Sequence, residues 1–365
     1  MIKSYSISIY PDKDMDMNRI KRYIQQAAHY SCRDVFTSAH MPEKSFEEQL
    51  AGIVDIATAV HKNEMMLTVD FGGRSLLEAL RNKKYQNLIQ QAEIDYIRLD
   101  YGYDATIMKK VYEILGTRGF VWNASIMQEC ELLKYVSICD QYTDMRIEAC
   151  HNFYPRPETG LDITFMRNQY DLFHSRGIRV TGCLASMTHA RPPIYAGLPT
   201  AEVHRNMPLQ EAALELDRTR TADSILMGDE FISEKELQQL HDIVRRQPLV
   251  LHCSLHPDIT AIEKKLLLKV HTIRYDSNSW ILRSQTSREM AELAHELPAH
   301  NTMERRALSI TIDNERYSRY SGEIQFVLKN LPADERVNVI GWINNEDAWK
   351  LRYAKSGYSY LLIVI

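Results

Sequence analysis

Polar side chains capable of acid–base chemistry recur at the ends of short apolar segments in the first two-thirds of the chain. Each follows a stretch whose alternating or β-branched residues are typical of a buried strand. In chain order the set is Tyr10, His40, Asp70, Asp100, Asn123, Asn152 and Asp229. The carboxyl ends of parallel strands meet at one end of a barrel, so these side chains are expected to converge there. Converging carboxylates suit glycoside hydrolysis, in which one protonates the leaving oxygen and another acts as nucleophile or as base for water.

Side-chain alternation along a strand predicts which residues face the interior of the barrel. In the strand that ends near residue 100 the apolar parity points outward, so Arg98 and Asp100 are expected to point inward. The same reasoning places Asp70 and Glu148 inside, whereas the parity near Asp229 is ambiguous. We predict Asp100 and Asp229 as the leading acid, base or nucleophile candidates, with Asp70 and Glu148 in reserve.

Each of these assignments has a structural alternative. An aspartate at a strand end often only caps the next helix. Arg98 and Glu148 lie on alternate strands and could form an ion pair that holds the barrel together, since an unpaired buried charge is costly.

Eight strand-like segments alternate with amphipathic stretches in the first part of the chain. The strands are expected at residues 4–10, 34–37, 65–70, 94–101, 120–125, 146–151, 178–183 and 223–228. The helices are expected at residues 18–29, 46–61, 76–92, 105–116, 126–135, 164–176 and 209–217. Eight such units predict an α/β fold, a (β/α)₈ TIM barrel. A doubly wound open sheet is the alternative, but no glycine-rich phosphate loop follows the first strand.

The pattern changes after a last helix that ends near residue 246. Short strand-like segments separated by turns then dominate, at residues 248–253, 271–275, 280–283, 307–312, 323–328, 336–340 and 358–365. We therefore expect a TIM-barrel domain over 1–246 and a small β-barrel domain over 247–365.

Composition narrows the function classes. The chain has 44 Lys and Arg against 48 Asp and Glu, a net charge of −4, which does not favour nucleic acid as a partner. No apolar run approaches the length of a membrane helix and no signal peptide is evident, so we expect a cytoplasmic protein without a membrane partner. The 13 histidines form no metal-binding motif, and neither a metal nor another cofactor is expected. The six cysteines are expected to be free thiols.

Residues 150–161 form an unusual segment that passes from a strand into a proline-rich loop. It presents four polar side chains, His151, Asn152, Tyr154 and Arg156, and prolines on both sides stiffen the backbone at the arginine. A loop that merely closes one barrel face is the alternative. The following loop adds Arg191, His204 and Arg205, and the loops after the late strands of such barrels often bind phosphate.

These segments resemble the MupG family of 6-phospho-N-acetylmuramidases, glycoside hydrolase family 170. The likeness covers nearly the whole chain and is most specific at residues 151–157, with further matches at 8–11, 36–40, 97–102, 123–125, 193–200, 320–325 and 336–341. The resemblance implies a TIM barrel followed by a cyclophilin-like β-domain. It implies release of 6-phospho-N-acetylmuramic acid from the non-reducing end of a phosphorylated cell-wall disaccharide in peptidoglycan recycling. The sequence departs from the family pattern at Glu158 and Pro192.

Under this interpretation the phosphorylated amino-sugar disaccharide contacts the ring of polar residues and the cationic loops. In the second domain Arg274, Asp276 and Arg283 could form a lid or a homodimer contact, or simply a solvated ion-pair surface. Two other functions remain open: a non-catalytic sugar-phosphate binder or regulator, and a TIM-barrel hydrolase of another phospho-glycoside. A Schiff-base aldolase is less favoured, because no lysine falls on the inward parity of the expected strands.

Overall fold

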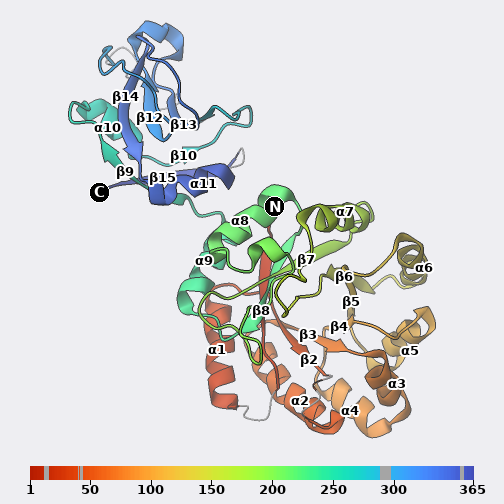
Figure 1. Ribbon diagram of the computed structural model, residues 1–365. Coiled ribbons are helices and arrows are strands. Elements are labelled where there is room, and N and C mark those ends of the chain that lie inside the picture. Colours follow the sequence, from red (N-terminus) through yellow and green to blue (C-terminus); the bar gives the residue numbers. More distant parts are fainter. Residues whose placement is uncertain (12–15, 40, 42–43, 288–296, 354–356) are drawn as a thin grey trace. The chain divides into compact units, whose positions relative to one another are not determined.

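The computed structural model describes residues 1–365 except 12–15, 40, 42–43, 288–296 and 354–356. The chain divides into two compact units, Met1–Val244 and Arg245–Ile365 (Figure 1). None of the helices in the described part of the chain is both long and apolar enough to cross a membrane.

The first unit is a closed barrel of eight parallel strands that follow one another in sequence order. The ring closes where β8 pairs with β1. The strands are β1 Ser4–Ser8, β2 Asp34–Ser38, β3 Met66–Phe71, β4 Tyr96–Leu99, β5 Gly119–Asn123, β6 Arg146–Cys150, β7 Arg179–Leu184 and β8 Ser224–Glu230. The predicted TIM barrel is therefore confirmed.

Helices between successive strands surround this barrel (Figure 1). They are α1 Met17–His29, α2 Phe46–Lys62, α3 Gly73–Arg81, α4 Lys83–Gln91, α5 Ala105–Leu115, α6 Glu129–Cys139, α7 Ile163–His174, the 3₁₀ turn η1 Glu202–His204, α8 Leu209–Thr219 and α9 Glu234–Arg245. The single helix expected over 76–92 is instead divided into α3 and α4. Asn82 has an extended backbone there, and its side chain caps α4 by accepting a 2.9 Å hydrogen bond from the Lys84 amide.

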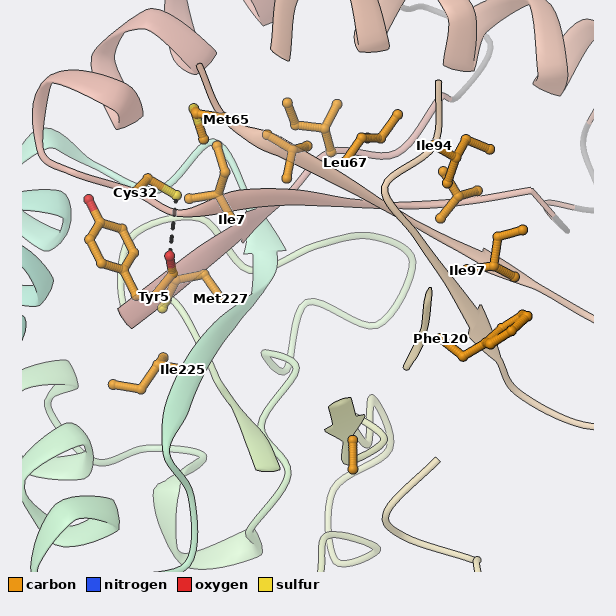
Figure 2. Close-up of a cluster of buried hydrophobic side chains, with 14 of the residues drawn as sticks. Tyr5, Ile7, Cys32, Met65, Leu67, Ile94, Ile97, Phe120, Ile225 and Met227 are labelled. Atoms are coloured by element: carbon orange, nitrogen blue, oxygen red, sulfur yellow. Dashed lines mark hydrogen bonds between the residues drawn. The ribbon is translucent and has the colours of Figure 1, made fainter. Parts of the chain in front are cut away.

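Two layers of side chains hold the barrel together. Residues of the outward parity pack beneath the helices in one large apolar core, part of which appears in Figure 2. Ile7, Leu67, Ile97 and Phe120 belong to it and are fully buried. Burial of each such side chain stabilises the fold by roughly 1.5–3 kcal/mol. The inward parity fills the barrel with a smaller cluster that includes Tyr10.

The second unit contains a seven-stranded sheet with the order β10-β15-β9-β14-β12-β13-β11. Its strands are β9 Leu249–Leu255, β10 His271–Thr272, β11 Ile281–Arg283, β12 Ser309–Asp313, β13 Ile324–Val327, β14 Val337–Ile343 and β15 Ser359–Val364. The helical segments are α10 Ala261–Leu267, η3 Glu315–Tyr320, η4 Asn345–Asp347 and α11 Ala348–Tyr353. The sheet curls into a half-barrel, which confirms the predicted fold class of a TIM barrel followed by a small β-domain.

Candidate active site at the carboxyl ends of the barrel strands

A buried arginine lies at the centre of the polar residues at the carboxyl ends of β3 to β6. Arg98 Nη1 donates to Asp70 Oδ1 at 2.9 Å and to Asp100 Oδ1 at 3.1 Å, and Nη2 donates to Asn152 Oδ1 at 2.5 Å. Burial opposes the charge of the guanidinium, but the nearby carboxylates, Asp70 foremost, outweigh it and raise the pKa of Arg98. Arg98 is therefore a permanent cation that orients three side chains.

Asp100 is the accessible carboxylate of this group. Its Oδ1 accepts from Arg98 and also from Asn123 Nδ2 at 2.9 Å, while the same amide donates to Asn152 Oδ1 at 3.0 Å. Oδ2 of Asp100 makes no hydrogen bond within the described residues, and the side chain is 22% exposed, against 9% for Asp70. This arrangement fixes one carboxylate oxygen and leaves the other open to a ligand.

Ser125 anchors both asparagines from behind. Its amide donates to Asn123 Oδ1 at 3.0 Å, and its Oγ accepts from the Asn152 amide at 2.9 Å. The Ser125 Oγ also lies within hydrogen-bond distance of His151 Nδ1, at 3.1 Å. Burial and then the charge of Arg98 lower the pKa of His151 to about 3, so the imidazole is neutral. His151 is thus a buried, neutral residue that helps to orient Ser125.

Glu148 points to the other end of the barrel and does not form the ion pair with Arg98 that was the structural alternative for it. Its two oxygens accept from Arg33 at 2.8 and 2.6 Å, and Arg179 lies 3.9 Å away. Both partners lie where β2 and β7 begin. Arg98 and Glu148 are in register through Val121 of β5, and because barrel strands are tilted, residues in register on alternate strands lie at different heights. This position argues against the catalytic role that we predicted for Glu148 as a second choice after Asp100.

Asp229 is enclosed by the backbone of the loop after β7. Its Oδ2 accepts from the amides of Ser186 at 2.9 Å and Leu198 at 3.2 Å, and its Oδ1 accepts from the Arg191 amide at 2.8 Å. Burial raises the pKa of Asp229 despite these hydrogen bonds, and the residue is fully buried. The geometry favours a role in positioning the loop over direct contact with a substrate.

The neighbouring Glu230 lies partly exposed at the same strand end and was missed from the sequence. Its Oε2 accepts from the Tyr10 amide at 3.2 Å. The ambiguous parity of β8 hid this residue, whereas its place two residues after a predicted strand was a usable signal.

Arg205 has no hydrogen-bond donor left for a ligand. Its Nε and one Nη2 proton reach Glu202 at 2.7 Å each, and Nη1 reaches the carbonyls of Ala196 and Gly197 at 3.2 Å each. The last Nη2 proton reaches the Arg156 carbonyl at 3.2 Å. All five N–H groups are used within the protein. This geometry favours loop anchoring over the phosphate contact predicted for Arg205.

His204 and Tyr154 occupy different surroundings. His204 is buried, and its Nε2 lies 2.8 Å from Glu215 Oε2 on α8, so it packs within the fold. Tyr154 is half-buried, and its amide donates to the Pro199 carbonyl at 2.9 Å, which joins the loops after β6 and β7. The predicted site residue His40 lies outside the described residues.

Two arginines at this end of the barrel keep free donors. Arg156 is exposed, and its guanidinium has no hydrogen bond or ion pair within the described part of the chain. Arg191 places its Cζ 3.4 Å from the centre of the Tyr10 ring, and Nη2 contacts Met41 Sδ at 3.7 Å. The Tyr10 hydroxyl in turn donates to the Gly228 carbonyl at 3.0 Å. Both arginines remain available to bind an anion.

Comparisons with known proteins agree over both units. Family models described as 6-phospho-N-acetylmuramidase, N-terminal, and 6-phospho-N-acetylmuramidase, C-terminal, match residues 5–242 and 249–363. The chain is similar to the crystal structure of an uncharacterized Bacillus cereus protein, with 25% identity, a TM-score of 0.75 and complete coverage of both chains. It is also similar to a conserved Enterococcus faecalis protein of unknown function, with 29% identity, a TM-score of 0.72 and coverage of 99% and 96%. No curated protein matches the chain significantly.

Proposed function

The chain belongs to the 6-phospho-N-acetylmuramidase family, and we propose that it is a glycosidase acting on a 6-phosphorylated muramyl sugar. The proposed substrate is 6-phosphomuramyl-N-acetylglucosamine, from which 6-phospho-N-acetylmuramic acid is released at the non-reducing end. We place this reaction in the recycling of peptidoglycan sugars in the cytoplasm.

One observation carries the proposal: Asp100 is oriented through Oδ1 and presents Oδ2 at the barrel mouth. Preorganised groups of this kind contribute to catalysis because they need not rearrange when charge develops on the sugar. We assign Asp100 as the principal catalytic carboxylate, acting as nucleophile, base or electrostatic stabiliser at the anomeric carbon. Asp70 shares Arg98 with it and remains the second carboxylate candidate.

The remaining polar groups would bind the sugar. The Nδ2 group of Asn152 makes no hydrogen bond within the described residues and suits the hydroxyl and acetamido groups of an amino sugar. Both Nδ2 protons of Asn123 are donated to Asp100 and Asn152, so Asn123 orients these two residues. Arg156 and Arg191 supply cationic donors for the two anionic groups of a 6-phosphomuramyl sugar, its phosphate and its carboxylate. Asp229, His204 and Arg205 support the loops that carry these residues.

The test compares the phosphorylated disaccharide with its unphosphorylated form, with products read by mass spectrometry. Asp100→Asn should lower kcat by roughly a hundredfold to ten-thousandfold, because it removes a positioned catalytic carboxylate. Asp171→Asn is the matched control, since Asp171 is 60% exposed on α7 and should leave activity unchanged.

Two outcomes would contradict the proposal. Equal activity of Asp100→Asn and the parent protein would remove Asp100 from the mechanism. Binding of the phosphorylated disaccharide without product from the parent protein would favour a non-catalytic sugar-phosphate binder.

A further inference from the structure

A cavity opens at the carboxyl ends of β7, β8 and β1, and we call it the arginine pocket. Its volume is about 290 Å³, and its lining includes Tyr10, Arg19, His189, Arg191, Glu230 and Phe231. Arg19 comes from the first turn of α1, and His189 and Arg191 come from the loop that Asp229 holds in place. Two separate elements, α1 and the loop after β7, therefore bring two arginines and a histidine to one cavity.

Both arginines in this pocket are held by aromatic faces. Arg19 Cζ lies 3.8 Å from the centre of the Phe231 ring, as Arg191 Cζ lies 3.4 Å from that of Tyr10. When a guanidinium stacks on an aromatic ring, its flat face contacts the ring. The N–H groups at the edge of the guanidinium then remain free to donate hydrogen bonds to an acceptor such as an oxyanion. The rings thus restrict the arginines without consuming their donors.

Neither guanidinium has an oxygen partner within the described residues. The one hydrogen bond of the Arg191 guanidinium within the described residues is the 3.7 Å approach to Met41 Sδ, a weak acceptor. By contrast, Arg33, Arg98 and Arg205 are each bound to carboxylates of this chain. The pocket therefore has unused cationic donors that match an oxyanion.

Two carboxylates also line the arginine pocket. Asp16 caps α1, with Oδ1 accepting from the Asn18 amide at 2.9 Å, and Glu230 accepts from the Tyr10 amide. They balance the charge of the two arginines, so a strong general attraction for anions is not expected. Carboxylates accept hydrogen bonds from hydroxyl groups, and arginines donate to phosphate oxygens. A sugar phosphate supplies both kinds of group, whereas inorganic phosphate supplies one.

The location of the pocket fits a substrate whose phosphate lies away from the reacting bond. In the closed ring of strands, β8 and β1 lie across the barrel from β4 and β5, which carry Asp100 and Asn123. In a 6-phosphorylated pyranose the phosphate is carried on the exocyclic C6, so it lies outside the ring and away from the anomeric carbon. Contacts at such a remote group can orient the bond that reacts.

We infer that the arginine pocket binds the phosphate monoester of the sugar substrate, with Arg19 and Arg191 as its ligands. This inference rests on the proposed function for the identity of the substrate, but the pocket can be tested without catalysis. The probe is N-acetylglucosamine 6-phosphate, with N-acetylglucosamine as the unphosphorylated control, and binding is measured by calorimetry.

Arg19→Gln and Arg191→Gln should each weaken binding of the phosphorylated probe by roughly tenfold to a hundredfold, because each removes a charge-assisted hydrogen bond. Arg22→Gln is the matched control. Arg22 is exposed on the same helix and lies outside the pocket, so the affinity of this variant for the phosphorylated probe should equal that of the parent protein. Arg19→Lys keeps the charge but loses the planar fork of donors, so its affinity for the phosphorylated probe should lie between those of the parent protein and Arg19→Gln. Circular dichroism verifies that each variant is folded.

Unchanged affinity in both glutamine variants, or an equal loss in Arg22→Gln, would overturn the inference. Activity measurements separate this result from the proposed function. If the phosphorylated disaccharide is cleaved and KM is unaffected in Arg19→Gln and Arg191→Gln, the pocket assignment fails while the glycosidase stands. If the probe binds through both arginines and no disaccharide is cleaved, the pocket stands while the glycosidase assignment fails.

Discussion

Single hydrogen bonds decide how the catalytic candidate is presented at the barrel mouth. Asp100 is held by Arg98 and Asn123, and Asn123 is held in turn by the amide of Ser125. The Ser125 hydroxyl serves Asn152 and His151 at once. One small residue behind the site therefore positions both asparagines, Asn123 through its backbone amide and Asn152 through its hydroxyl.

Replacement of this serine provides a prediction at the residue scale. Ser125→Ala leaves the Asn152 amide and His151 Nδ1 without their partner, which should destabilise the barrel by about 1–3 kcal/mol. Denaturant unfolding measures this loss, and kcat on the phosphorylated disaccharide should fall with it. Ser125→Thr retains the hydroxyl and should recover part of kcat.

The control for this variant is Ser137→Ala. Ser137 is exposed on α6 and its hydroxyl donates to the Lys134 carbonyl at 2.8 Å, within the same helix, so stability and kcat should hardly change. A Ser125→Ala protein with parental kcat would show that the asparagines keep their positions without the hydroxyl.

The long loop between β7 and α8 is shaped by buried acidic anchors. Asp229 accepts three of its backbone amides. Glu236 accepts from Ser186 Oγ at 2.9 Å and from the Met187 amide at 2.8 Å. Glu202 binds Arg205, which ties this loop to the one after β6. The arginine pocket depends on these anchors because they fix the path of the backbone around Arg191.

Glu202 gives a pH-dependent prediction at the scale of these loops. Hydrogen bonds from Arg205 lower the pKa of Glu202 to about 2, and the amides of Glu158 and Gly160 add to this by donating at 2.9 and 2.8 Å. A carboxylate whose pKa is lowered on folding stabilises the protein above its unfolded pKa of about 4.5, and this contribution is lost as the pH falls toward 2. Protection of residues 156–160 from hydrogen exchange should therefore decline below pH 4.5.

Glu202→Gln should show the weakened loop already at neutral pH, with a loss of about 1–3 kcal/mol in local stability because Arg205 loses a charged partner. Glu78→Gln, at an exposed position on α3, is the control and should match the parent protein. If exchange at residues 156–160 is the same in both variants, the Glu202–Arg205 pair does not anchor this loop.

At the scale of the whole molecule, each unit has its own buried core and its own polar interior. In the second unit Arg274 and Arg283 form ion pairs with Asp276 and Glu323, with shortest distances of 2.7 and 2.6 Å. These pairs agree with the ion-pair alternative for this surface, and the lid and homodimer roles stay predictions. Beside them lies Asp313, which is buried at the end of β12, and within the described residues its side-chain oxygens accept only from the Gln325 amide, at 3.4 Å.

Asp313 makes the stability of the second unit depend on pH. Burial, followed by the charge of Glu323, raises the pKa of Asp313 to about 8, against 3.8 for an ordinary aspartate. The folded state then binds one more proton than the unfolded state between these pH values, so the free energy of unfolding falls as the pH rises from about 4 to about 8. Asp313→Asn should remove this dependence and stabilise the unit at pH 8.

Hydrogen exchange over residues 309–313, corrected for the intrinsic exchange rate at each pH, measures this effect within the full chain. The control is Asp258→Asn, because Asp258 is 76% exposed and should retain the parental pH profile. A parental profile that is flat between pH 5 and pH 8 would contradict a raised pKa for Asp313.

The sequence alone was sufficient to predict the barrel, the β-rich second part and the inward direction of Arg98 and Asp100. Alternation along a strand and periodicity along a helix are local properties, and eight repeats of one unit leave few folds to choose from. The family could also be predicted, because its most specific motif lies within one short segment, residues 151–157.

The partners of each side chain were decided only by the tertiary structure. Strand tilt pairs Arg98 with Asp70 and leaves Glu148 to Arg33, although parity alone allowed the other pairing. Arg19 joins the arginine pocket only because β8 closes against β1 and brings the first helix beside the last loops. Charge and hydrogen bonding depend on distances between residues far apart in the chain, and those distances are set by how the strands close and the loops pack.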